Sequence, residues 1–317
     1  MNKPKENNMK INVASIRQAT FRSEFSLDRE SGQSIQDYLS KEIERRIDLV
    51  RENILLASEN KEKNIPLFFS LPEFFWNIKW NTLKNKDELY QLTDYMMHYL
   101  SDAQESLMNS LPESEVGKIV LLAGTMVVLV ETSNDGVFEP LNYCLISNNF
   151  KKKNDGRFER SMWPKRTTSH IDFGLKDKVT NNGFIFTFAD KLTVEVLNKT
   201  QHVGEHDNNI NYGFSIDNNI INDCPFSINL CLDYGRVKPG ERNDELIESS
   251  SKIDFLLACG MSLSPNYKYP PSVRFAVRND GMRDGKVECF SIKNRHLFKK
   301  IPQRELNTRL SMVELTL

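Results

Sequence analysis

Cys231 combines a reactive side chain with a position from which a fold can present it. The apolar run Phe226–Leu230 ends at this thiol, and the carboxylate of Asp233 follows two positions later. A thiol is intrinsically a strong nucleophile, and a strand that ends in a turn can hold a nucleophile rigidly at a pocket. Most free cysteines, however, are small buried hydrophobes. Cys231 therefore becomes a candidate nucleophile only in combination with other residues.

Two further side chains with useful chemistry stand at the ends of predicted strands. Glu73 closes the apolar run 65–71, directly after Pro72, and Lys165 follows Met162-Trp-Pro. Taken singly, Glu73 is equally a charge at the start of a helix, and Lys165 is equally an exposed surface lysine. Their order along the chain is glutamate, then lysine, then cysteine. This order makes the three residues a candidate catalytic set.

These three residues occur in contexts that resemble the nitrilase, or carbon–nitrogen hydrolase, superfamily. Leu71-Pro-Glu73-Phe-Phe looks like the glutamate motif of that family, Lys165 stands in the place of its lysine, and Asn229-Leu-Cys231-Leu-Asp233 looks like its nucleophile motif. The predicted order of strands and helices also follows the family over most of the chain. The resemblance implies a four-layer α-β-β-α sandwich with two mixed sheets, and homo-oligomers built by packing of helix layers.

The resemblance implies a Glu73–Lys165–Cys231 triad, and the chemistry accounts for these residue types. The thiolate of Cys231 would attack a carbonyl or nitrile carbon, with Glu73 as general base for the thiol and later for water. The ammonium of Lys165, with a backbone N–H after the cysteine, would stabilise the developing oxyanion. A thiol of pKa ~8.5 is only a few per cent ionised at pH 7, so a base and a cation are needed together.

The chain departs from the family pattern around the lysine and after the cysteine. Many active members carry a second glutamate a few residues after the lysine, where this chain offers Asp172 or His170. Leu232 follows Cys231 where the family has Tyr or Trp. The interval between Lys165 and Cys231 is also long for the family.

A competing alignment takes Lys199 as the family lysine and Glu205 as the second glutamate. Lys199 lies closer to Cys231 in the sequence. We favour Lys165, because Asn142 and the turn that follows it lead directly to that lysine.

The segment His202-Val-Gly-Glu205-His206 fits the H-x-x-E-H pattern of inverted zinc proteases, which are a different class of enzyme. That motif needs a sound helix to bring both histidines to one face. Gly204 and the run that starts at Asp207 oppose such a helix. We therefore expect no metal site here.

Hydrophobic periodicity predicts the elements that would position the triad. Apolar residues recur at helical spacing over 35–57 and 86–111. Ser34 is expected to cap the first helix, with Asp37 three residues later. Apolar or alternating runs predict strands at 10–20, 65–71, 119–130, 141–146, 226–230, 253–258 and 286–292.

Alternating strands and helices predict an α/β fold, and the absence of repeats or a clear linker predicts a single domain over 1–317. Residues 175–222 are polar, rich in Asn and weakly periodic. We expect them to form an insertion outside the two central sheets, near the pocket mouth or at a subunit contact. Residues 147–160 and Asn279-Asp280-Gly281 are expected to form turns.

Composition narrows the function classes further. The net charge of -1 over 317 residues gives no global basic field for nucleic acid or an anionic membrane. No apolar run approaches the ~18 residues of a membrane helix, and no secretory signal is visible. The cysteines are odd in number and form no CxxC, which favours free thiols in a cytoplasmic compartment: Cys144, Cys224, Cys231, Cys259 and Cys289.

These observations predict a cytoplasmic, thiol-dependent hydrolase of a non-peptide carbon–nitrogen bond, with a covalent acyl-enzyme on Cys231. The expected partners are a small amide, carbamoyl or nitrile substrate and further copies of this chain, and no cofactor is expected. The alternative is a catalytically silent nitrilase-like interaction protein, which the lack of a clear second glutamate and the segment 175–222 favour. The sequence leaves the substrate open, and with it the choice between hydrolysis and acyl transfer.

Overall fold

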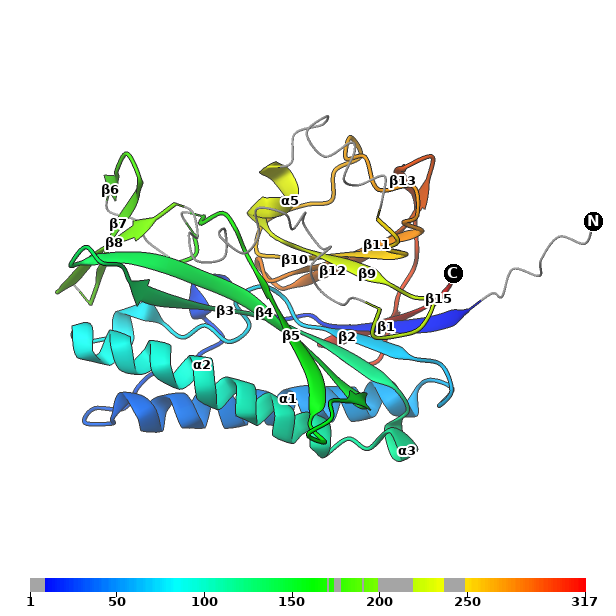
Figure 1. The fold of residues 1–317 in the computed structure, drawn as a ribbon, viewed down its shortest axis with the longest axis horizontal. Coiled ribbons are helices and arrows are strands. Elements are labelled where there is room, and N and C mark those ends of the chain that lie inside the picture. The colour runs from blue at the N-terminus through cyan, green and yellow to red at the C-terminus, as the bar shows by residue number, and fades with distance from the viewer. Residues whose placement is uncertain (1–8, 170, 174–177, 190, 199–218, 237–248) are drawn as a thin grey trace, which may run out of the picture.

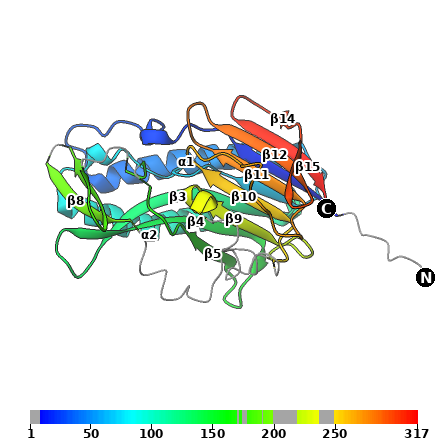
Figure 2. The same ribbon diagram turned by 90° about the horizontal axis from the view of Figure 1, so that it is seen from above.

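The computed structural model describes residues 9–169, 171–173, 178–189, 191–198, 219–236 and 249–317. The chain has an α/β fold in which two mixed β-sheets stack face to face (Figure 1). Helices α1 and α2 cover the outer face of the larger sheet, and the smaller sheet packs on its inner face. Figure 2 looks down through the smaller sheet onto the larger one.

The larger sheet has ten strands, in the order β14-β15-β1-β2-β3-β4-β8-β7-β6, with β5 also paired to β4. Parallel pairing of β1 with β2 and of β2 with β3 requires crossover connections, and the long helices supply them. Its strands are β1 (Lys10–Ile16), β2 (Leu67–Ser70), β3 (Ile119–Glu131), β4 (Val137–Lys152), β5 (Phe158–Pro164), β6 (Lys178–Val179), β7 (Gly183–Phe188), β8 (Leu192–Leu197), β14 (Arg304–Glu305) and β15 (Leu310–Thr316).

The smaller sheet has five strands in the order β13-β12-β11-β10-β9. Strands β9, β10 and β11 are parallel, and all six residues of β10 are buried, as expected for a strand covered on both faces. Its strands are β9 (Phe226–Leu230), β10 (Ile253–Ala258), β11 (Phe275–Asp280), β12 (Lys286–Lys293) and β13 (His296–Lys300).

The two long helices confirm the helical periodicity in the sequence. Helix α1 spans Ile35–Glu59, and the Ser34 side chain accepts the N–H of Asp37 at its start. Helix α2 spans Lys86–Asn109 and is capped in the same way by Asn85. The short helical segments are η1 (Phe21–Ser23), η2 (Trp80–Thr82), α3 (Glu113–Val116) and α5 (Leu232–Arg236).

Aromatic side chains fill the space between the two sheets. Phe68 of β2 contacts Phe226 of β9 and Phe255 of β10, with ring centroids 5.2 Å and 5.4 Å apart. All three side chains are buried. Because β2 and β9 precede Glu73 and Cys231, this contact fixes the relative position of the two sheet ends that carry these candidate site residues.

Two expectations about local structure are wrong, and several strands were not predicted. Residues 147–160 do not form a turn throughout, because β4 runs to Lys152 and β5 begins at Phe158. Asn279 and Asp280 end strand β11, where Asn279 donates to the Ser70 carbonyl at 3.0 Å. The strands that were not predicted are β5 to β8, β11 and β13 to β15; β15 pairs along the whole length of β1.

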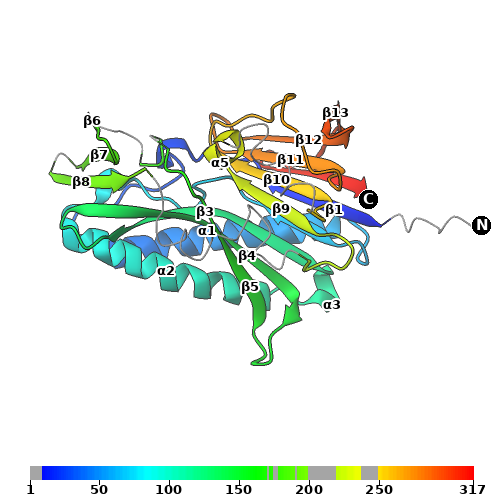
Figure 3. The same cartoon turned by 45° about the horizontal axis from the view of Figure 1, so that its top comes forward.

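The expectation that 175–222 lie outside the two central sheets is wrong where the structure describes this segment. The expected position near a pocket agrees with Thr187 and Phe188, which line a cavity. Residues 178–197 form β6, β7 and β8, and β8 joins the larger sheet through pairs at Val137 and Phe138. The buried rings of Phe186 and Phe188 belong to the same hydrophobic core as the buried side chains of α1 and α2. These strands lie at the end of the molecule opposite the C-terminus (Figure 3). Residues 199–218 lie outside the described residues.

The outer face of the smaller sheet differs from the expected four-layer order. Among the described residues it carries loops and the five-residue helix α5, and no long helix. The architecture that the structure supports is therefore two stacked mixed sheets with one layer of long helices. The structure has no helix, within its described part, that is long and apolar enough to cross a membrane.

Candidate active site

Cys231 lies in the turn between strand β9 and helix α5. Its backbone has a φ of 43°, a left-handed conformation that costs free energy for any residue with a Cβ. The turn is held by the Cys231 N–H, which donates to the Leu257 carbonyl at 2.9 Å. The thiol is 5% exposed, and its Sγ lies 3.6 Å from the Cys259 carbonyl oxygen. A strained strand–turn–helix position is typical of presented nucleophiles.

Glu73 follows β2 in a second strained turn. Phe74, the next residue, has a φ of 62° and donates its N–H to Thr125 Oγ1 at 2.9 Å. Thr20 Oγ1 donates to the Glu73 carbonyl at 2.6 Å. The glycine at 124 is required here, because a Cβ at that position would lie 2.5 Å from the Pro72 carbonyl oxygen. Glu73 is thereby held with its side chain completely buried.

Lys165 reaches this carboxylate from the end of β5. Its Nζ lies 2.9 Å from Glu73 Oε1 and 2.8 Å from Asp172 Oδ1, and all three side chains are buried. The Lys165 N–H donates to the Asn142 carbonyl at 2.7 Å, which ties the lysine to β4. The structure therefore brings the predicted glutamate and lysine together, and Cys231 interacts electrostatically with both.

Asp172, one of the residues considered for the second acidic position, lies beside Lys165. Its Oδ2 accepts the Ser169 N–H at 2.9 Å, while its Oδ1 contacts Lys165. The other residues considered around the lysine lie outside the described residues: His170, Lys199, His202, Glu205 and His206. Within the described part of the chain, no group of three or more metal-binding side chains could hold a metal ion.

The two oxygens of Glu73 have different surroundings. Oε1 accepts from Lys165 Nζ and from Asn142 Nδ2, the latter at 3.1 Å. Oε2 is buried and has no hydrogen bond of standard geometry among the described residues, although the Cys231 thiol lies close enough to help lower the pKa of Glu73. Burial raises the pKa of Glu73 to about 7, because the Asp172 charge adds to the desolvation and the Lys165 charge offsets only part of it. Oε2 is thus an unoccupied acceptor on a carboxylate suited to proton transfer near neutral pH.

The other two titrating groups keep their protons. Burial lowers the pKa of Lys165, but the charges of Asp172 and Glu73 outweigh it and leave that pKa well above its usual value. Burial and the charge of Glu73 hold the pKa of the Cys231 thiol well above its usual value, against the opposing effect of Lys165. The site therefore contains a charged ammonium and a neutral thiol.

Two contacts of the candidate site were not predicted from the sequence. Asn142 was noted only as a landmark, yet its amide holds Glu73 Oε1. Asp233 accepts the N–H groups of Arg166 and Thr167 at 2.8 Å and 3.0 Å, which joins the turn after Cys231 to the loop after Lys165. A polar residue within the apolar run of β4 was the available signal for Asn142; no local signal gave the partners of Asp233.

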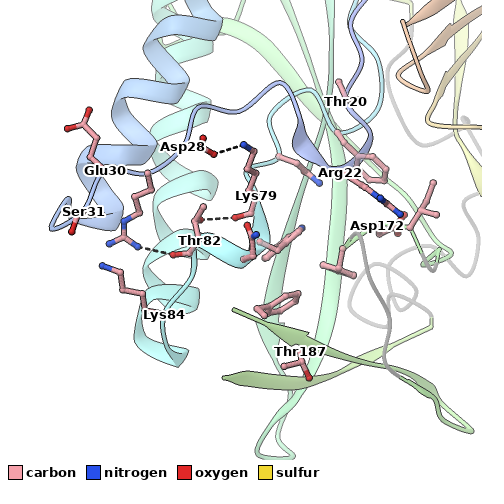
Figure 4. Close-up of a pocket in the computed structure, with 18 of the residues that line it drawn as sticks. Thr20, Arg22, Asp28, Glu30, Ser31, Lys79, Thr82, Lys84, Asp172 and Thr187 are labelled. Carbon is pink, nitrogen blue, oxygen red and sulfur yellow. Dashed lines mark hydrogen bonds and ion pairs between the residues drawn. The ribbon is translucent and has the colours of Figure 1, made fainter. Parts of the chain in front are cut away.

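A cavity of about 720 Å³ adjoins the site. Phe74, which follows Glu73, and Asp172, which contacts Lys165, line it, whereas Glu73, Lys165 and Cys231 are not among its lining residues. Figure 4 shows Thr20, Arg22 and Asp172 at one end of this cavity and Glu30, Ser31 and Lys84 at the other. A cavity of this size accommodates a small organic molecule.

No known protein-family profile matches the chain, and no curated protein sequence matches it.

Proposed function

We propose that the protein is a thiol-dependent hydrolase of a non-peptide carbon–nitrogen bond, with Cys231 as nucleophile, Glu73 as general base and Lys165 as oxyanion stabiliser. The observation that carries the proposal is the buried ammonium of Lys165 between two carboxylates, beside a thiol and an unbonded Glu73 oxygen. We also infer that the two-sheet sandwich is a divergent nitrilase-like fold. The order of β1, α1, β2, α2 and β3 and the triad at strand ends support that inference.

Acylation of an amide substrate follows from this arrangement. Cys231 Sγ attacks the carbonyl carbon while its proton passes to Glu73 Oε2, and the carbonyl oxygen becomes an oxyanion near Lys165 Nζ. The carbon–nitrogen bond then breaks, and Glu73 returns the proton to the departing amine. The products of this half-reaction are a thioester on Cys231 and free amine or ammonia.

Deacylation uses the same groups. Glu73 takes a proton from water as the water oxygen attacks the thioester carbon, and Lys165 again faces the oxyanion. The carbon–sulfur bond breaks, the thiol recovers its proton, and the carboxylic acid leaves. A base with a pKa of about 7 is matched to both steps at neutral pH, because it accepts and releases a proton with little cost.

The burial of Cys231 favours the alternative of a catalytically silent interaction protein. An inert core thiol would have the same high pKa as Cys144, whose pKa burial raises to about 12. The two functions differ in thiol reactivity, because only a catalytic thiol has a base positioned to remove its proton during attack.

Covalent labelling distinguishes these functions. Iodoacetamide at neutral pH should alkylate Cys231 at least tenfold faster than Cys144, as read by mass spectrometry of peptides. Glu73→Gln should remove that difference while Asn142 and the fold remain. Equal rates at Cys231 and Cys144 in the unaltered protein would rule out the hydrolase and leave the silent protein.

A further inference from the structure

One layer of side chains separates the cavity from Glu73 and Lys165. Thr20, Phe74 and Asp172 line the cavity, and each also touches one of these two residues. Thr20 Oγ1 donates to the Glu73 carbonyl, Asp172 Oδ1 lies 2.8 Å from Lys165 Nζ, and the Phe74 ring centroid lies 5.6 Å from the same Nζ. Figure 4 shows Thr20 and Asp172 at the same end of the cavity. A molecule in this cavity is therefore one side chain away from the Lys165 ammonium.

Two members of this layer are held by hydrogen bonds. The Thr20 hydroxyl donates to the Glu73 carbonyl at 2.6 Å. Asp172 is held at both oxygens, one by Lys165 Nζ and the other by a backbone N–H at 2.9 Å. Moving either side chain would leave a buried polar group without its partner, which is costly. The Phe74 side chain has no polar atom, so it is the member of the layer that can move without this cost.

The backbone of Phe74 is held in place, and only its ring is free of hydrogen bonds. Its N–H donates to Thr125 Oγ1 at 2.9 Å, and its carbonyl accepts the Asn77 N–H at 3.0 Å. Arg46 in turn holds the carbonyl of Asn77 at 2.9 Å. The ring itself is 3% exposed and packs in the main hydrophobic core. Movement at this position is therefore a change of side-chain rotamer on a rigid backbone.

We infer that Phe74 is the specificity-determining side chain of the proposed hydrolase: its ring closes the cavity from the candidate triad, and its rotation admits the reacting group to Lys165 and Cys231. The inference rests on the proposed function for the identity of the nucleophile. In the closed position the ring lies against the Lys165 ammonium. Rotation gives that space to the carbonyl of the substrate. Because the reacting group must pass the ring, bulk near the reacting carbon should be selected against.

Alkylation of Cys231 by two reagents of different size measures this access. In both reagents the thiolate sulfur displaces iodide from a CH₂ carbon, but iodoacetanilide carries a phenyl ring on the amide nitrogen where iodoacetamide carries hydrogen. The ratio of the two rates at Cys231, divided by the same ratio for glutathione, is read by mass spectrometry of peptides from the full chain. We expect iodoacetanilide to be disfavoured roughly tenfold in the unaltered protein and only about twofold in Phe74→Ala.

Phe188→Ala is the matched control. Phe188 is also 3% exposed and lines the same cavity, but its ring stacks on Trp80 at 5.3 Å. Its substitution should leave the size preference unchanged. Cys144, which is completely buried, reports general opening of the fold, so its rates should be alike in Phe74→Ala and Phe188→Ala. Phe74→Leu keeps more of the side-chain volume and serves if the alanine variant does not fold; it should lower the preference roughly twofold.

The inference is overturned if the unaltered protein shows no size preference, if both Phe74 variants keep it, or if Phe188→Ala lowers it equally. Rates at Cys144 that rise in parallel with those at Cys231 would also overturn it. Glu73→Gln in the same assay tests the proposed function separately. A Cys231 rate that depends on Glu73, with a size preference that does not depend on Phe74, would keep the hydrolase and refute the inference. The reverse result would keep Phe74 as the barrier to Cys231 and refute the hydrolase.

Discussion

Two buried glutamates in this protein lie against buried cations, and their pKa values move in opposite directions. Glu42 of α1 contacts Arg46 at 2.5 Å, and Glu73 contacts Lys165 at 2.9 Å. Burial alone would raise the pKa of Glu42, but Arg46 and Arg45 outweigh it and lower that pKa. Burial dominates at Glu73 and raises its pKa to about 7.

The pKa values of Glu42 and Glu73 shift in opposite directions because the two ion pairs differ in how fully their polar atoms are hydrogen-bonded. Arg46 also donates to the carbonyls of Phe75 and Asn77, at 2.6 Å and 2.9 Å, and to Ser26 Oγ at 2.7 Å. Glu73 instead shares its cation with Asp172 and keeps Oε2 unbonded. A fully bonded pair stabilises one charge state, whereas a partly bonded one can exchange a proton.

The two pairs are also connected. The carbonyls that Arg46 holds belong to the segment directly after Glu73 and Phe74. The Glu42–Arg46 pair therefore fixes the loop from which the strained turn at Phe74 is built. One pair provides the rigid support, and the other provides the titrating group that the support positions.

The largest expected effect tests whether the Glu73–Lys165 pair supports a nucleophilic Cys231. Cys231→Ala should lower amide hydrolysis by several orders of magnitude, because no other group can form the acyl intermediate. Its stability cost should be small beside the ~2–5 kcal/mol of large-to-small core changes. Cys231→Ser should be nearly as inactive. Full activity of Cys231→Ala on a substrate found by screening would exclude the thiol mechanism; thermal melting of each variant is the control for folding.

Matched amide substitutions separate the two glutamates. Glu73→Gln should lower kcat/KM by roughly 10²–10⁴-fold through loss of the base, with no loss of stability at pH 8, since Lys165 keeps Asp172 as its counter-charge. Glu42→Gln should cost about 3–5 kcal/mol in the free energy of unfolding, because it leaves Arg46 buried without its carboxylate. Its effect on kcat/KM of the folded protein should be small.

Denaturant unfolding and steady-state kinetics on both variants provide the measurement. If Glu73→Gln destabilises the protein as much as Glu42→Gln and both retain activity, the two pairs are equivalent structural ion pairs. The comparison on which the functional interpretation rests would then be wrong.

The two glutamates should also give the protein opposite dependences of stability on pH. Glu73 must be ionised to act as a base, so kcat/KM should rise roughly tenfold per pH unit below pH 7 and level off above it. Because its folded pKa is raised, its contribution to stability is present below pH ~4.5 and is lost as the pH rises through 7. Glu42 has the opposite sign: its contribution is present above pH ~4.5 and is lost in acid.

A pH profile of kcat/KM and unfolding curves at pH 5 and pH 8 measure these trends. Stability of Glu73→Gln relative to the unaltered protein should increase from pH 5 to pH 8. A flat kcat/KM between pH 5.5 and 7.5 would show that Glu73 is not the base.

Many of the helices and strands could be predicted from the sequence, because they depend on the local pattern of hydrophobic and capping residues. The bounds of β9 and β10 match the expected runs residue for residue, and Ser34 caps α1 as its type and position indicate. Strands β11 and β13 could not be found in this way. Strand β13 is largely exposed, and both strands are held in place by pairing with neighbouring strands of the sheet. Neither therefore has a hydrophobic pattern that would identify it as a strand from its own residues.

The residues of the candidate site could be proposed from the sequence, but their hydrogen bonds and pKa shifts could not. Glu73, Lys165 and Cys231 were recognisable from their motifs, but the unbonded Oε2 depends on where Asn142 and Asp172 lie in space. The hydrogen bonding of these side chains depends on contacts between residues far apart in the chain. Such contacts cannot be predicted from the residues next to each position in a single sequence.

The smallest expected effect concerns Asp233, which links the two halves of the site. Its carboxylate accepts two N–H groups from the loop after Lys165, and burial raises its pKa although those donors oppose the shift. Asp233→Asn presents an amide N–H₂ toward one of these donors and should cost about 1.5–3 kcal/mol, the worth of a hydrogen bond to a charged group. If the link only stabilises the fold, the melting temperature should fall while kcat stays constant. If it also positions Lys165, kcat should fall roughly tenfold with KM nearly unchanged, because the oxyanion contact forms only in the transition state. We expect the second result, and an unchanged kcat in a destabilised variant would restrict Asp233 to a structural role.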